Sequence, residues 1–172
     1  MRIRILKILL VVIGAFQALV YGLQNIANLD QAYAAVAYVA SMEGHSVYPN
    51  HFFPPVTNPT IIWLILGAII TMELAGGLLA LVGAVRMAMS HNGTFNAFNA
   101  SKRPAIIGLG LMLILWIGMF CAIGGAYFQM WQTQAGAASL NGAFIYAVTS
   151  GLILGIVAQP EPPRADRRSS DD

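Results

Sequence analysis

At 172 residues the chain has room for one domain. Hydrophobic residues make up 58% of it and charged residues only 9%, which excludes an ordinary soluble protein, in which about 25% of residues are charged. The formal net charge is +2, and the cations lie in short segments at the ends of the apolar runs, which suits anionic lipid headgroups and excludes a basic face for nucleic acid.

Four apolar runs are each long enough to cross a bilayer, which takes roughly 20 helical residues. They cover residues 5–27, 60–85, 104–128 and 138–158. The first run resembles a secretory signal, but it is longer than a normal signal core, so we expect an uncleaved span. The pattern predicts an all-α, integral membrane bundle of four transmembrane helices over residues 1–158.

The cations of the chain predict its orientation. All nine Lys and Arg lie before or at the start of the first run, between the second and third, or after the fourth. They are Arg2, Arg4, Lys7, Arg86, Lys102, Arg103, Arg164, Arg167 and Arg168. Because Lys and Arg near span ends resist translocation, we expect both termini in the cytoplasm. The proline-rich, charged tail over residues 159–172 is predicted to be a disordered cytoplasmic segment.

The connection over residues 28–59 is too long for a turn and is predicted to form an outer cap. It begins with a helical pattern through about Met42 and continues with an aromatic, proline-rich stretch over 44–55. Its polar residues Glu43, His45 and His51 are of the kind that bind Zn or Cu. Their spacing matches no compact metal motif, so we expect no metal there.

Small residues recur at every fourth position in each predicted span, which places each set on one helix face. They include Gly14, Ala18, Gly22, Gly76, Gly118, Ala122, Gly151 and Gly155. One interpretation is packing within the bundle. The other is contact with a second copy or a partner subunit, for which the Gly151–Gly155 pair is the best candidate.

Glu73 is the one charged side chain deep in a predicted span, roughly 18 Å from the outer end of its helix. A charge at that depth costs about 2.5–3.5 kcal/mol on insertion scales. No Lys, Arg or His lies at similar depth, but the first span carries a polar stripe. That stripe consists of Gln17, Tyr21, Gln24 and Asn25. We expect hydrogen bonds from Gln17 and Tyr21 to Glu73, serving either helix packing or proton handling, ligand binding or quinone contact.

Several kinds of site are missing from the sequence. No predicted span contains His, which argues against a haem held by two histidines. There is no phosphate-binding glycine loop, and no Ser/His/Asp or Cys/His set falls at one membrane depth. We therefore predict no cofactor and name no catalytic residues, and an enzyme is the less favoured interpretation.

Several short motifs together carry a family resemblance. They are Gln24-Asn25-Ile26, Ser41-Met42-Glu43 followed by Pro49, Glu73, Phe98-Asn99 with Lys102, and the run from Gly124 to Gln132. In their order and spacing the chain resembles a bacterial family of predicted small integral membrane proteins of unknown function. The resemblance implies four spans and a location in the inner (plasma) membrane. The chain departs from the family pattern at Ala126-Tyr127, where a Glu-Trp pair is usual, which speaks against paired-carboxylate chemistry.

Three functions remain as hypotheses. The first is a non-catalytic accessory or structural subunit of a larger membrane complex, in contact with partner subunits or further copies of itself. The second is a small carrier that moves protons or a small solute past Glu73. The third is a module that binds a lipid or quinone at the same residue.

Overall fold

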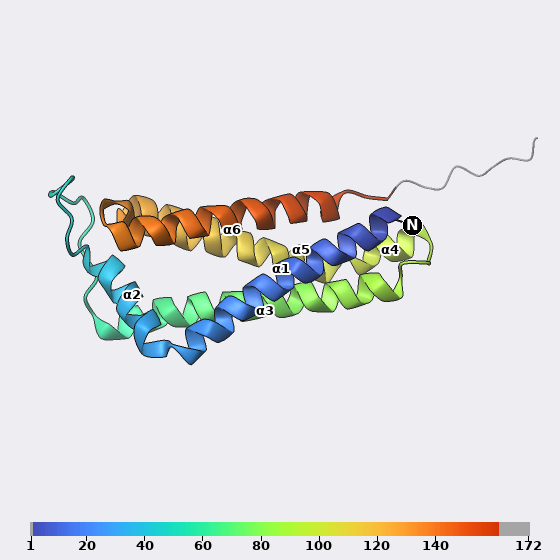
Figure 1. Ribbon diagram of the computed structural model, residues 1–172, viewed down its shortest axis with the longest axis horizontal. Coiled ribbons are helices and arrows are strands. Elements are labelled where there is room, and N and C mark those ends of the chain that lie inside the picture. Colours follow the sequence, from blue (N-terminus) through green and yellow to red (C-terminus); the bar gives the residue numbers. More distant parts are fainter. Residues whose placement is uncertain (1, 162–172) are drawn as a thin grey trace, which may run out of the picture.

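The computed structural model describes residues 2–161, which form helices and connecting loops and contain no strand (Figure 1). The elements are α1 (Arg2–Ala27), α2 (Leu29–Ser41), α3 (Pro59–Met89), α4 (Phe95–Ser101), α5 (Arg103–Leu113), the π-helix η1 (Ile114–Tyr127), the 3₁₀-helix η2 (Met130–Gln132) and α6 (Gln134–Ala158). The predicted all-α membrane bundle is confirmed. Most of the predicted tail, with Arg164, Arg167 and Arg168, lies outside the described residues.

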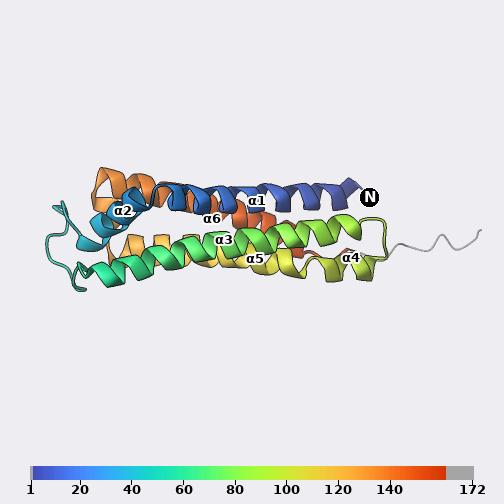
Figure 2. The same cartoon turned by 90° about the horizontal axis from the view of Figure 1, so that it is seen from below.

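Four helical segments are long and apolar enough to cross a membrane. They are α1, α3, the continuous stretch Phe95–Tyr127 formed by α4, α5 and η1, and α6, and they run side by side (Figures 1 and 2). Each begins before its predicted apolar run, and polar N-caps stabilise the first turns of all but α1. Asn58, Thr94 and Thr133 each accept a backbone N–H of the following first turn through the side-chain oxygen.

Glycines and alanines bring α3 into backbone contact with its neighbours. A Cβ added to Gly83 would overlap the backbone of Ala105, and one added to Gly108 would overlap that of Gly76 and Ala80. A Cβ on Gly77 would lie 2.7 Å from Cγ of Leu19 on α1. This close approach is the packing that membrane helices use where lipid provides no hydrophobic drive.

The predicted small-residue faces divide into two groups. Those on α1 and α3 are buried inside the bundle: Gly14, Ala18, Gly22 and Gly76. Those on η1 and α6 are not buried: Gly118, Ala122, Gly151 and Gly155. Nothing lies within 4 Å of a Cβ added to Gly155, so this position faces away from the bundle.

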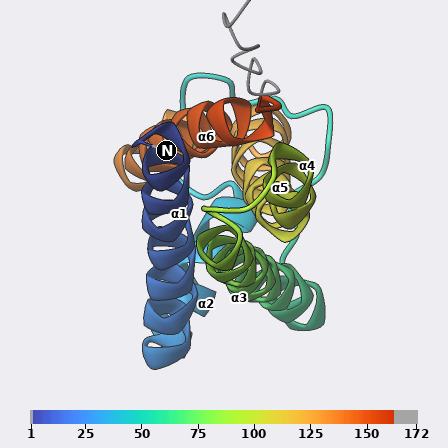
Figure 3. The same cartoon turned by 90° about the vertical axis from the view of Figure 1, so that its right-hand side faces the viewer.

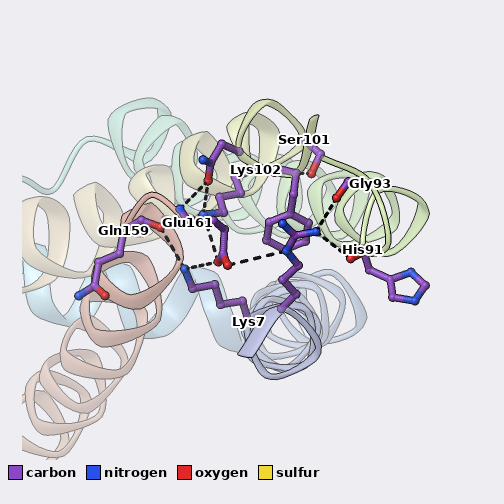
Figure 4. Close-up of polar contacts among 10 residues, drawn as sticks. Lys7, His91, Gly93, Ser101, Lys102, Gln159 and Glu161 are labelled. Atoms are coloured by element: carbon purple, nitrogen blue, oxygen red, sulfur yellow. Dashed lines mark hydrogen bonds and ion pairs between the residues drawn. The ribbon is translucent and has the colours of Figure 1, made fainter. Parts of the chain in front are cut away.

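The two ends of the bundle differ. At one end the start of α1 lies beside the α3–α4 connection and the end of α6; we call this the basic end, after Arg4, Lys7 and Lys102 (Figures 1 and 4). At the other, the α2 end, α2 lies between the level of α6 and that of α3 (Figure 1) and is seen behind α1 and α3 when viewed from the basic end (Figure 3). The half of the bundle nearer the basic end is filled by side chains such as Val11 and Leu109, both fully buried.

Candidate functional site: a cavity at the α2 end

A cavity of about 750 Å³ lies between α2 and the four spans. Helices α1, α2, α3, η1 and α6 all contribute to its wall, which is mainly apolar. The polar side chains of the lining are Tyr21, Asn25, Glu73, Trp116, Tyr127, Ser139 and Tyr146. Its size falls within the roughly 300–1,000 Å³ that small-molecule sites occupy, and an apolar wall with a few polar groups is typical of such sites.

The wall contributed by η1 is unusual because it is π-helical over 14 residues. The hydrogen bond from the backbone N–H of Phe128 to the carbonyl of Ile123, at 2.9 Å, shows the five-residue spacing of this helix type. Most π-helices are single turns inside α-helices, and they occur frequently at functional sites. Here η1 presents Trp116, Phe120 and Ile123 to the cavity.

Glu73 lines the cavity from α3 and is only 1% exposed. Its Oε2 accepts a hydrogen bond of 2.9 Å from Nδ2 of Asn25, which is the one side-chain hydrogen bond to this carboxyl within residues 2–161. Met112, on α5, would lie 2.9 Å from a Cβ on Gly76, one turn from Glu73 towards the basic end. The carboxyl is therefore at the inner limit of the cavity, where close packing begins.

Three aromatic side chains that line the same cavity cluster together. Tyr21 lies one helical turn from Asn25 on α1, and its hydroxyl is hydrogen-bonded to that of Tyr146 on α6. The ring centroid of Trp116 lies 6.0 Å from that of Tyr21 and 5.1 Å from that of Tyr146. Phe120 extends the cluster, with its centroid 5.2 Å from that of Trp116.

No Lys, Arg or His from the described residues lines the cavity. An ionised carboxylate here would therefore lack a protein cation, and burial of an unpaired charge in hydrocarbon is costly. Glu73 consequently either carries a proton or faces a cation that a ligand brings.

The structure brings part of the predicted polar stripe to this site. Tyr21 and Asn25 line the cavity with Glu73, whereas Gln17 is half-buried, Gln24 is exposed, and neither lines it. Tyr146 also lines the cavity but is not among the residues that the sequence predicted for the site. A signal was present in Trp116, whose mid-span position indicated a polar neighbour on another helix.

The outer-loop residues lie apart from the cavity lining. Glu43 is exposed, and the rings of His45 and His51 lie 5.5 Å apart. Burial, together with the nearby charge of His51, lowers the pKa of His45. Within residues 2–161 no three His, Cys, Asp or Glu side chains are grouped so that they could hold a metal ion. The loop is fixed to η2 by backbone N–H groups of Val47 and Tyr48 that donate to Oε1 of Gln132.

A second polar cluster, at the basic end, ties the chain after α6 to the bundle. Figure 4 shows Lys7 and Lys102 beside the Glu161 carboxylate, with Nζ–Oε1 distances of 2.9 and 3.8 Å. Both lysines also donate to the backbone carbonyl of Gln159, at 3.0 and 2.8 Å. Burial alone would raise the pKa of Glu161, but the hydrogen bond from Lys7 and the surrounding cations lower it below its usual value. Residues 159–161, predicted as the start of the tail, are thus packed against the spans.

A known protein family matches the sequence of the chain. The model of the family described as "Predicted small integral membrane protein (DUF2165)" matches residues 3–160. The chain belongs to this family. The resemblance read from the short motifs is confirmed, and with it the description of a small multi-pass integral membrane protein. The family description states no reaction or ligand. No curated protein and no solved structure matches the chain.

Proposed function

We propose that the protein binds a small apolar or amphipathic molecule in the cavity at the α2 end, with the polar part of that molecule at Glu73. The observation that carries this proposal is the position of a buried carboxyl at the inner limit of an apolar cavity of about 750 Å³. A side chain that served only to join helices would not need such a space beside it. Of the three hypotheses from the sequence, this geometry favours the ligand-binding module.

Packing near the basic end favours binding over transport through the bundle. Met112 and Leu109, at 2% and 0% exposure, fill the bundle on that side of Glu73. Molecules of suitable chemistry are those that partition into the bilayer, because they would cover the mainly apolar cavity wall, which would otherwise be left in contact with water.

The test is to isolate the protein with its native lipids in nanodiscs and to identify bound small molecules by mass spectrometry. Ala35→Phe, on the cavity side of α2, should fill the site, whereas Ala34→Phe is its control on the same helix, at an exposed residue outside the lining. A molecule retained by the wild type and the control but lost from Ala35→Phe would support the proposal. Equal retention by both variants, or none by the wild type, would contradict it.

A second candidate function is the accessory subunit, and the outward position of Gly155 favours it. The exposed Gly155 and Ala122 leave small-residue surface open for another helix, from a second copy or a partner subunit. We place the basic end on the cytoplasmic side of the inner (plasma) membrane, because Arg4, Lys7 and Lys102 gather there.

Native mass measurement in mild detergent tests this second candidate. Gly155→Leu should reduce the mass of the assembly, whereas Gly67→Leu should not, although a Cβ on Gly67 also has nothing within 4 Å. A wild type that is purely monomeric in its native lipids would contradict a role as a subunit.

A further inference from the structure

We propose that the polar part of the ligand is a cation and that its binding displaces a proton from Glu73. This inference rests on the proposed function, since it names the chemical class of the molecule in the same cavity. The ligand would be a lipophilic ammonium or phosphonium ion, with its charge at the inner limit of the cavity and its apolar groups against the wall formed by α2.

The hydrogen-bonding groups of the site include acceptors that suit a cation. The hydroxyls of Tyr21 and Tyr146 bond to each other, and Tyr127 donates to the carbonyl of Pro54 at 3.4 Å. Asn25 donates one side-chain N–H to Glu73, and its amide oxygen remains as an acceptor. The donors left in the lining are the second side-chain N–H of Asn25, the O–H of whichever tyrosine accepts in the Tyr21–Tyr146 pair, the Trp116 indole and the Ser139 hydroxyl. Donors and acceptors are both present, so the preference for a cation rests on the carboxyl, which has no Lys, Arg or His beside it in the lining contributed by residues 2–161.

The aromatic cluster points to the same ligand class. Ring faces attract cations within about 6 Å of their centroids, and groups of such rings bind quaternary ammonium compounds. Tyr21, Trp116 and Tyr146 lie with their centroids 4.8–6.0 Å from one another around one side of the cavity. The combination of these rings with a carboxyl and no protein cation is the chemistry of a lipophilic-cation site.

Charge balance determines the stoichiometry. Without a ligand, the carboxyl of Glu73 carries a proton, because no Lys, Arg or His among residues 2–161 lines the cavity. When a monovalent cation enters, the O–H bond of that carboxyl breaks, the proton passes to water, and the carboxylate pairs with the ligand. Among residues 2–161, the other titratable groups in the cavity lining are the phenols of Tyr21 on α1, Tyr146 on α6 and Tyr127 on η1, while α2 contributes only Ala and Val. One proton therefore leaves for each cation bound.

Three probes of similar size but different charge test this inference by calorimetry in detergent. They are tetraphenylphosphonium, neutral triphenylphosphine oxide and anionic tetraphenylborate. The wild type should bind the phosphonium in preference to the others and release one proton per cation into weakly buffered solution. While the empty site stays protonated, its affinity for the cation should rise about tenfold for each unit of increasing pH.

Variants separate the charge of Glu73 from its place in the fold. Glu73→Gln should weaken phosphonium binding by about 30-fold or more and abolish proton release, since it removes one partner of a buried charge pair. Glu73→Asp keeps a carboxyl and should retain the release of a proton. Glu43→Gln, at an exposed residue outside the lining, is the control and should behave as the wild type.

The outcomes distinguish this inference from the proposed function. Preferential phosphonium binding with proton release that depends on a carboxyl at position 73 supports both. Binding of the neutral oxide as tightly as the phosphonium, without proton release, overturns the cation inference and leaves the cavity as a binding site. If no probe binds and the wild type retains no native molecule, both are overturned.

Discussion

Gly108 on α5 lies against the backbone of α3 at a place where a methyl group has no room. A Cβ there would overlap the carbonyl oxygen of Gly76 and the amide nitrogen of Ala80, and it would lie 3.1 Å from Cα of Ala80. Because these are backbone atoms, Gly108→Ala must push the two helices apart. Overpacking of this kind costs about 1–3 kcal/mol.

Gly110→Ala provides the control on the same helix, because a Cβ at Gly110 has nothing within 4 Å. Replacing glycine by alanine inside a helix contributes about 0.5–1 kcal/mol of stability at either position. That contribution cancels when the two variants are compared, so Gly108→Ala should be less stable than Gly110→Ala by about 1–3 kcal/mol. Reversible unfolding in mixed micelles, titrated with sodium dodecyl sulfate, measures the difference. Equal stability of the two variants would refute the close crossing of α3 and α5.

The remaining predictions concern the two ends of the bundle. In the same titration at pH 7, Glu161→Gln should lose about 1.5–3 kcal/mol of stability, because Lys7 loses a charged hydrogen-bond acceptor and Lys102 loses an ion-pair partner. An unchanged midpoint would contradict the cluster. The fold lowers the pKa of Glu161, so the stability that this carboxylate contributes is fully present above the ordinary carboxyl pKa of about 4.3. That stability is lost as the pH falls through the lowered pKa, so the free energies of unfolding of the variant and the wild type should converge in acid. The lowered pKa of His45 favours the neutral imidazole, so the stability that it contributes is present above about pH 6.5 and is lost as the pH falls below it. Amide hydrogen exchange over residues 45–53, corrected for intrinsic rates, should therefore accelerate between pH 7.5 and 5.5 in the wild type and less so in His45→Gln; identical acceleration in both would contradict this role.

The sequence was sufficient to predict the number and approximate position of the spans, because apolar runs of this length have few alternatives to a membrane helix. Their ends were less predictable. Residues 95–103 read as a polar connection, yet Phe95–Ser101 is helical and Phe98 is fully buried. The N-cap at Thr94 and a long-range contact explain the difference, with the Arg4 guanidinium 4.7 Å from the ring centroid of Phe98.

The partner of Glu73 could not be read from helical depth alone. Counting residues along each helix placed Gln17 at the same membrane depth as Glu73. The structure instead pairs Glu73 with Asn25, two turns farther along α1 than Gln17. Side chains lean towards the N-terminus of their own helix, so in an antiparallel pair they lean towards each other. Glu73 reaches towards the α2 end and Asn25 towards the basic end, which brings together residues that lie at different depths.

The cavity itself had no counterpart in the sequence pattern. It arises because α2 lies across one end of the bundle and because η1 adopts the wider π-helical form, and periodicity of apolar residues predicts neither. The pairing of Tyr21 with Tyr146 likewise depends on how α1 and α6 are placed around this space. Sequence reasoning could identify the carboxyl as exceptional, but only the fold shows what surrounds it.

The central claim, that Glu73 is a carboxyl facing an apolar cavity, is tested most directly by carbodiimide labelling in native membranes followed by peptide mass spectrometry. Dicyclohexylcarbodiimide partitions into hydrocarbon and reacts with protonated carboxyl groups, whereas a water-soluble carbodiimide reaches exposed ones. We predict that the apolar reagent modifies Glu73, that the soluble reagent does not, and that Ala35→Phe suppresses the modification while Ala34→Phe leaves it intact. An unmodified Glu73 in the wild type, or equal modification of it by both reagents, would contradict the account.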